Sequence, residues 1–274
     1  MREGVEQCAD EWGLEISEMR ETPTSLLAFG HRGSLPVVVK LSRPGGDEWD
    51  AGTIVEAFGG RGMARAYAHR PGAVLLEWLT PGTPLTTLTL AGQDDEATAI
   101  LADVLQRLVA PIVPEGCPTV EQWGQSFAAY LGGGNREIPQ ALVERGRTWY
   151  DVLATSQQQR RLLHGDLQHH NVLHDAQRGW LAIDPKGVVG ETEYDLGASL
   201  RNPSESFTTR QVLERRLAIY GARLPIALDR VLAWAYAQAV LSVIWECEDG
   251  VPVTPDNPTL RFATMIEPML PPPP

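Results

Sequence analysis

The feature that most constrains this chain is a pair of apolar runs that each lead into oxygen-bearing side chains. The segment HGDLQHHNVL, residues 164–173, holds Asp166 and Asn171, and the strand-like WLAI, residues 180–183, ends at Asp184. Phosphoryl transfer from ATP needs one carboxylate to orient or accept the proton of the attacking hydroxyl. An amide oxygen and a second carboxylate hold Mg²⁺ on the phosphates. The spacing favours Asp166 as the catalytic residue and Asn171 and Asp184 as metal ligands, whereas a lone Asp after Gly165 would be an ordinary turn residue.

These segments resemble a known family. Protein kinases carry the catalytic pattern H-x-D-x-x-x-x-N with a downstream Asp. HGD-L-x-x-x-NVL followed by IDPKG looks like the aminoglycoside phosphotransferase superfamily. The longer run WLAIDPKGVVGE, residues 180–191, together with Arg201-Asn202-Pro203 and WECEDG at residues 245–250, resembles its streptomycin 6-kinase and hydroxyurea-kinase branch.

The resemblance implies an α+β, protein-kinase-like bilobal fold with a small antiparallel sheet and a mainly helical lobe. Strand-like pieces alternate with turn residues up to the connector TPGTPL, residues 80–85, which is typical of a lobe boundary. We therefore expect an N-lobe over residues 1–79, made of an antiparallel sheet plus one helix that covers ATP. Residues 80–274 would form a helical C-lobe with the catalytic loop and the acceptor pocket.

A lysine within a strand indicates the phosphate contact. Lys40 stands in the β-branched run PVVVKL, residues 36–41, and a buried strand tolerates an ammonium group only if it finds partners. In the kinase arrangement this lysine meets the phosphates of ATP and a glutamate from the next helix. We expect that helix over Asp47–Phe58, with Glu48 as the partner of Lys40 and Glu56 as the alternative.

The remaining nucleotide contacts follow from the resemblance alone. Aminoglycoside kinases often cover the phosphates with a serine-bearing loop, which implies Ser25 or its neighbour Thr24; an ordinary β-turn is the alternative. In kinase folds the main chain of the connector between the lobes pairs with adenine, which implies main-chain contacts from Glu77 and Leu79.

Carboxylates near the end of the chain suggest how the acceptor binds. In the resembled branch this late region lines the acceptor pocket, and carboxylates there would suit ammonium or guanidinium groups. The alternative is a solvated acidic helix end. The candidate acceptor residues are Glu191, Glu193, Asn202, Glu246, Glu248 and Asp249.

Composition limits the class of partner. The net charge of −12 opposes binding to nucleic-acid phosphates and is compatible with a cationic acceptor, although acidity also serves solubility. No apolar run approaches the roughly 18 residues of a membrane helix. The three cysteines show no metal or disulfide pattern, and the N-terminus lacks an apolar signal core, so we expect a cytoplasmic protein.

Helical periodicity dominates the second half of the chain. Apolar spacing predicts helices over Asp94–Val109, Thr119–Leu131, Pro139–Leu153, Thr208–Tyr220 and Pro225–Ile244.

Taken together, these features predict an ATP- and Mg²⁺-dependent kinase that phosphorylates a hydroxyl of a small molecule, with an aminoglycoside such as streptomycin as the favoured acceptor. Hydroxyurea and a hydroxylated metabolite are alternative acceptors. A pseudokinase-like module that binds nucleotide without turnover is the alternative from another class.

Overall fold

An antiparallel sheet forms the first part of the chain because short β-branched and apolar runs alternate there with turns. The computed structural model describes residues 1–43, 48–135 and 137–271. Within them a five-stranded sheet has the order β1-β2-β3-β5-β4, with every neighbouring pair antiparallel. Its strands are β1 (Glu15–Glu21), β2 (Ser25–Arg32), β3 (Leu35–Ser42), β4 (Ala66–Arg70) and β5 (Ala73–Glu77).

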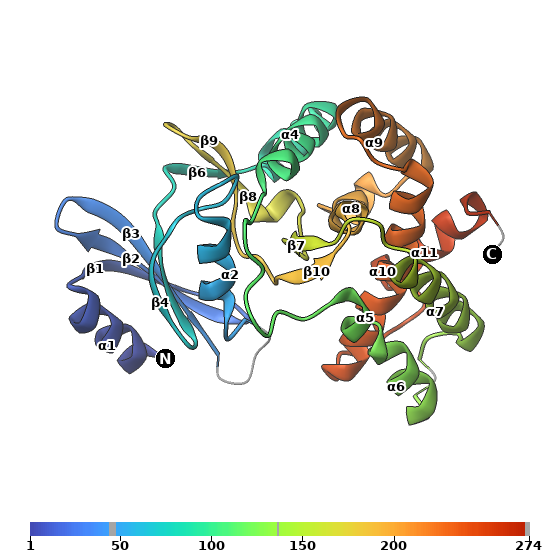
Figure 1. Ribbon diagram of the computed structural model, residues 1–274, viewed down its shortest axis with the longest axis horizontal. Coiled ribbons are helices and arrows are strands. Elements are labelled where there is room, and N and C mark those ends of the chain that lie inside the picture. Colours follow the sequence, from blue (N-terminus) through green and yellow to red (C-terminus); the bar gives the residue numbers. More distant parts are fainter. Residues whose placement is uncertain (44–47, 136, 272–274) are drawn as a thin grey trace.

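Two helices accompany this sheet, α1 (Arg2–Trp12) and α2 (Ala51–Phe58). The sequence predicted a helix over Asp47–Phe58, which included Glu48; Asp47 lies outside the described residues. The structure corrects this position, since Glu48 lies in the turn before Ala51. The small sheet is therefore covered by α2 and flanked by α1 (Figure 1).

Short strands beyond the connector build the platform for the catalytic segment. β6 (Pro81–Pro84) pairs with β8 (Val172–Asp175), and β8 pairs with β9 (Gly179–Ala182). A second pair joins β7 (Arg161–Leu163) to β10 (Val188–Gly190). Because β7 and β8 flank residues 164–171, and β9 and β10 flank residues 183–187, the two pairs bring both oxygen-bearing segments to one place.

Helices make up most of the rest of the chain. The predicted helix over Thr119–Leu131 is divided at Gly124, and Thr119 begins it with a reciprocal capping box to Gln122. The helices are α3 (Thr86–Leu90), α4 (Asp94–Arg107), α5 (Val120–Trp123), α6 (Gln125–Gly133), α7 (Gln140–Thr155), α8 (Thr192–Arg201), α9 (Arg210–Arg223), α10 (Leu228–Glu248) and α11 (Pro258–Ile266). Short 3₁₀ turns span His169–Asn171, Glu205–Phe207 and Glu267–Met269.

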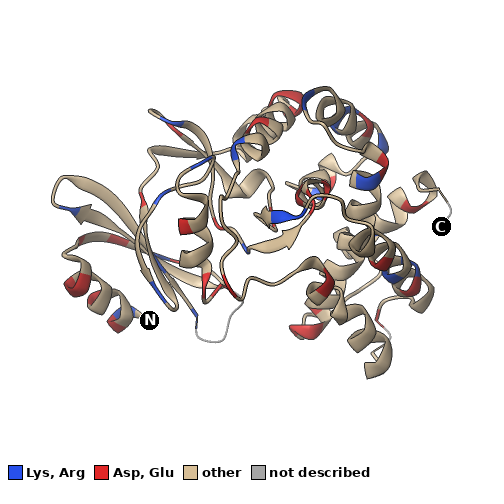
Figure 2. Ribbon diagram, in the orientation of Figure 1, with Lys and Arg blue, Asp and Glu red and all other residues tan. Residues whose placement is uncertain are grey.

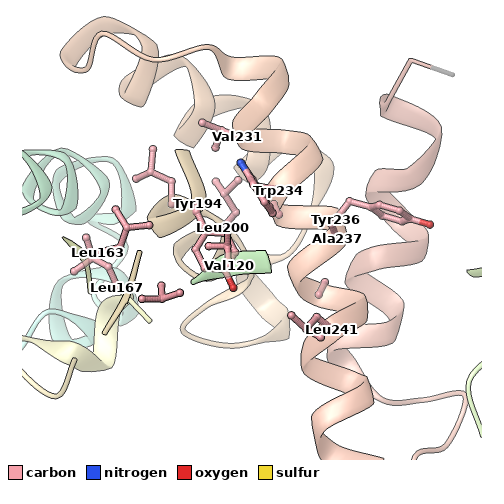
Figure 3. Packing of buried hydrophobic residues seen from close by; sticks show 14 of the residues in the cluster. Val120, Leu163, Leu167, Tyr194, Leu200, Val231, Trp234, Tyr236, Ala237 and Leu241 are labelled. Atoms are coloured by element: carbon pink, nitrogen blue, oxygen red, sulfur yellow. The ribbon is translucent and has the colours of Figure 1, made fainter. Parts of the chain in front are cut away.

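The main hydrophobic core surrounds α10, which is apolar on nearly every side and packs most extensively against α8, α7 and α11. Figure 3 shows Trp234 of this helix beside Tyr194 of α8, and their rings meet edge to face at 4.9 Å. A smaller core lies between α1 and the sheet, around Val5 and Val37. The main core also includes Ile54, Val55 and Phe58 of α2, so it extends from the helical part to the helix that covers the sheet.

The architecture agrees with the predicted α+β class: a small antiparallel sheet at one end and a mainly helical part at the other (Figure 1). Among the described helices, none combines the length and apolar character needed to cross a bilayer.

Candidate active site

The segment that carries Asp166 is held from behind by a buried carboxylate. Asp195, on α8, accepts hydrogen bonds from the main-chain N–H groups of His164 and Gly165, at 2.9 and 2.7 Å. Burial raises the pKa of Asp195, while the charge of His164 and these hydrogen bonds act in the opposite direction. The side chain of His164 adds a bond from its Nε2 to the carbonyl of Ile183, at 2.9 Å. Asp195 thus supports the segment that carries Asp166, and His164 ties that segment to the one that carries Asp184.

Asp166 and Asn171 are locked to each other. The Asn171 amide nitrogen donates to the main-chain oxygen and to Oδ2 of Asp166, both at 2.9 Å. This arrangement commits the Asn171 nitrogen inside the loop, so its amide oxygen is the atom left for a metal ligand. Among the described residues, only Oδ2 of the Asp166 carboxylate receives a side-chain hydrogen bond, which leaves Oδ1 free.

Lys40 reaches this centre from the other part of the molecule. Its ammonium group lies 2.7 Å from Oε2 of Glu48 and also contacts Oδ1 of Asp184. Burial alone would lower the pKa of Lys40, but the two carboxylates outweigh it and the pKa lies above its ordinary value. Lys40 is therefore a charged, buried group that joins the sheet to the segment after β9.

The structure distinguishes the two candidate partners of this lysine. Glu48 contacts Lys40, whereas Glu56 is 68% exposed at its side chain and pairs with His69 at 3.0 Å. Glu48 is the partner although it precedes the helix, because the turn before α2 directs it toward β3.

The other nucleotide-binding candidates lie on the sheet and its connector. Ser25 is buried at the start of β2, and its hydroxyl is 2.8 Å from that of Thr22. The Glu77 N–H is already bonded to the carbonyl of Arg65 at 2.9 Å, so only its carbonyl could meet adenine. Leu79 is buried just before the connector turns into β6.

The chemistry of the donor set fits a hard divalent cation bound together with phosphates. Mg²⁺ prefers oxygen ligands and takes few of them from the protein, leaving the rest to waters and phosphates. Asn171 and Asp184 offer one amide oxygen and one carboxylate on adjoining segments, which the bond from Ile183 N to Asn171 O holds at 2.9 Å. Among the described residues no three His, Cys, Asp or Glu side chains cluster as a self-sufficient metal site.

Two neighbouring cavities share Lys186 and Trp245 as walls, and the inner one is lined by Asp166. The inner cavity, of about 320 Å³, is lined by Asp166, Gln168, Arg201, Asn202, Gln238 and Ser242 among others. The outer cavity, of about 690 Å³, opens between α2, α5 and the end of α10 and includes Asp50, Glu115, Trp123, Glu248 and Asp249. Figure 2 shows acidic residues at that end of α10.

The predicted acceptor residues separate into two groups. Asn202 lines the inner cavity, and Glu248 and Asp249 line the outer one. Glu193 accepts from the Ala227 N–H at 3.3 Å, Glu246 accepts from the Asn257 amide at 2.6 Å, and neither lines these cavities.

The expectation for Glu191 is wrong. Its side chain is only 5% exposed, is paired with Arg230, and accepts from the Trp234 indole at 2.6 Å. The carboxylate is therefore committed to packing α8 against α10 and does not face an acceptor.

The sequence analysis did not identify two cations that line these cavities. Lys186 and Arg201 both belong to the runs that carry the family resemblance, yet neither had been assigned a role. The signal in the sequence was a basic residue two positions after Asp184 and another in the Arg201-Asn202-Pro203 run.

Comparison with known proteins agrees with this geometry. Residues 15–250 match the model of the aminoglycoside/hydroxyurea antibiotic resistance kinase family. The chain is 33% identical over 245 residues to a streptomycin 3''-kinase of Klebsiella pneumoniae, covering 86% of this chain and 90% of the relative. It is 29% identical over 269 residues to a streptomycin 6-kinase of Streptomyces griseus, with 90% and 83% of the two chains covered.

Solved structures share the fold at low sequence identity. Aminoglycoside phosphotransferase APH(4)-Ia superposes with a TM-score of 0.70 at 14% identity, over 97% of this chain and 98% of that one. Choline kinase LicA from Streptococcus pneumoniae gives a TM-score of 0.65 at 16% identity, over 97% of each chain. These two structures confirm the kinase-like fold. The family match, in contrast, shows the family to which the chain belongs. The chain is a phosphotransferase that acts on small molecules, and it belongs to the aminoglycoside/hydroxyurea antibiotic resistance kinase family.

Proposed function

We propose that this kinase uses ATP and Mg²⁺ to phosphorylate a hydroxyl group of a cationic aminoglycoside, with streptomycin as the favoured acceptor. The observation that carries the proposal is the convergence of Asp166, Asn171 and Asp184 on adjoining segments, with Lys40 reaching Asp184 from the sheet. A binding module without turnover has no need of all four groups.

In the proposed reaction Asp166 serves the acceptor. Its Oδ1 orients the hydroxyl and receives the proton as the oxygen attacks the γ-phosphorus. The bond from that phosphorus to the bridging oxygen breaks, and ADP leaves. Because such transition states are loose, orientation of the hydroxyl contributes more than early proton removal.

Asn171 and Asp184 would hold Mg²⁺, which supplies charge neutralisation on the phosphates when it is bound. Lys40 would then exchange part of its contact with Asp184 for phosphate oxygens, while Glu48 keeps the ammonium in place. Ser25 would cover the phosphates, and the main-chain groups of Glu77 and Leu79 would meet adenine.

Size and charge of the cavities favour an aminoglycoside over hydroxyurea. The inner and outer cavities are about 320 and 690 Å³ and meet at Lys186 and Trp245, so they suit an acceptor with several rings. Glu248 and Asp249 in the outer cavity would receive ammonium or guanidinium groups. The streptomycin kinases among the relatives support the same choice.

The test is an Asp166→Asn variant assayed with ATP, Mg²⁺ and streptomycin by mass spectrometry of the product. We expect kcat to fall by about 10²- to 10⁴-fold, because the amide can neither accept the proton nor carry the negative charge. Asp10→Asn, which removes an exposed carboxylate from α1, is the matched control and should retain full activity. Undiminished transfer by the Asp166 variant would remove the catalytic assignment.

A further inference from the structure

The inner cavity carries a charge pattern opposite to that of the outer one. Its described lining includes a single carboxylate, Asp166, against two cations, Lys186 and Arg201; the remaining side chains are amides, hydroxyls and aromatic rings. The outer cavity combines four carboxylates with Lys186 alone. A cationic group would therefore be favoured in the outer cavity and disfavoured beside Arg201.

Arg201 stands out because, among the described residues, its guanidinium group forms no ion pair or hydrogen bond, although the charges of Asp166 and Glu246 act on it. It lies in the last turn of α8, and its Nη1 is shielded from solvent without a hydrogen-bond partner in the described part of the chain. Burial lowers the pKa of Arg201, and the nearby charge of Asp166 acts against this. A donor that is shielded from water and has no partner destabilises the fold, so its presence beside Asp166 in the inner cavity indicates a ligand.

The segment that presents Arg201 is firmly fixed. Arg216 of α9, itself fully buried, donates to the carbonyls of Ser199 and Asn202 at 2.8 and 2.6 Å. It is anchored in turn by Asp94 of α4, at 2.6 Å between Nη2 and Oδ1. Main-chain groups on both sides of Arg201 are thus held in place, so a rigid segment positions the Arg201 side chain at the wall of the inner cavity.

We propose that Arg201 is a specificity-determining residue that donates hydrogen bonds to an oxygen atom of the acceptor close to the reacting hydroxyl. The inner cavity then takes a neutral, oxygen-rich part of the acceptor and disfavours an amine there, while the cationic groups of the same molecule occupy the outer cavity. This inference rests on the proposed function, because it assumes that these cavities bind the acceptor.

The experiment compares wild type, Arg201→Met and Arg201→Lys by steady-state kinetics with streptomycin, and by calorimetric binding of streptomycin in the presence of ADP. Arg201→Met should raise the KM and the Kd for streptomycin at least about tenfold, while the KM for ATP changes by less than about twofold. Arg201→Lys should remain within about threefold of the Met variant, because an ammonium group lacks the planar donor fork. Arg261→Met, at an exposed arginine of α11, is the control and should match wild type.

A second acceptor tests the rejection of amines. Kanamycin, whose rings carry amines beside hydroxyls, should be a much poorer acceptor than streptomycin for wild type, and Arg201→Met should narrow the ratio of the two kcat/KM values by at least about fivefold. The inference would be overturned if Arg201→Met left the ratio of the two kcat/KM values unchanged, or if Arg201→Lys restored the wild-type KM and Kd for streptomycin. It would also be overturned if Arg201→Met lowered kcat without changing the Kd for streptomycin. If wild type binds streptomycin but transfers no phosphate to any acceptor, the proposed function fails, whereas the Kd values still decide the role of Arg201.

Discussion

Lys40 shows how one residue can combine a structural and a functional requirement. A buried ammonium group is unfavourable unless it is paired, and Lys40 has two carboxylate partners, one from its own lobe and one from the catalytic segment. If Asp184 takes up a metal ion, Glu48 is the partner that remains. In the proposed complex, Glu48 would therefore be the carboxylate that keeps Lys40 charged and directed toward the phosphates.

Substitution of Glu48 tests whether this residue is the partner of Lys40. Glu48→Gln should lower kcat/KM for ATP by about 10- to 100-fold, equivalent to about 1.4–2.8 kcal/mol, because Lys40 then competes with the metal for Asp184. Glu56→Gln is the matched control and should change it by less than about twofold, since that side chain is largely exposed. Equal effects of the two substitutions would contradict the pairing. Initial rates measured over a range of ATP concentrations at saturating acceptor give kcat/KM for both variants.

At the scale of elements, α8 and α10 form the scaffold on which the catalytic segment rests. Gly197 of α8 allows this close approach, because a Cβ at that position would lie 2.2 Å from Oε1 of Gln238. The Gln238 amide nitrogen in turn donates to the carbonyl of Tyr194 at 2.6 Å. Asp195, which braces the catalytic loop, is thus positioned by the packing of two helices.

Glu191 belongs to the same contact, and its loss should affect stability. Glu191→Gln should lower the free energy of unfolding by about 2–4 kcal/mol, because Arg230 would keep a partly buried charge without its partner. Glu193→Gln should cost at most about 1 kcal/mol, since only one hydrogen bond to the Ala227 N–H is weakened. Urea unfolding gives both values. A raised KM for the acceptor in a stable Glu191 variant would instead restore Glu191 to the acceptor site.

At the scale of the whole molecule, the sheet and the helical part meet around a few fixed contacts. Arg178, in the β8–β9 turn, pairs with Glu77 at the end of β5 and donates to the carbonyls of Gly60 and Met63. Gly187 packs so closely on α2 that a Cβ there would lie 2.6 Å from Ile54. These contacts cross the division that we place after Leu79, and they set the distance between Lys40 and the catalytic segment.

Much of this organisation could be predicted from the sequence, because the relevant signals are local. The β-branched run around Lys40 predicts the sheet, and the polar residues after two apolar runs predict the candidate active site. The partners of Glu191 could not be predicted, since the carboxylate meets Arg230 and Trp234 through helix packing 39 and 43 positions away. The helix α8 itself carries a mixed pattern and was not predicted as a helix.

The most direct test of the account is a crystal structure with a non-hydrolysable ATP analogue, Mg²⁺ and streptomycin. The account predicts a metal ion ligated by Asn171 and Asp184, phosphates beside Lys40, and a streptomycin hydroxyl facing Asp166 with cationic groups toward Glu248 and Asp249. A nucleotide bound away from Lys40 and Asp184, or an acceptor bound away from Asp166, would contradict it.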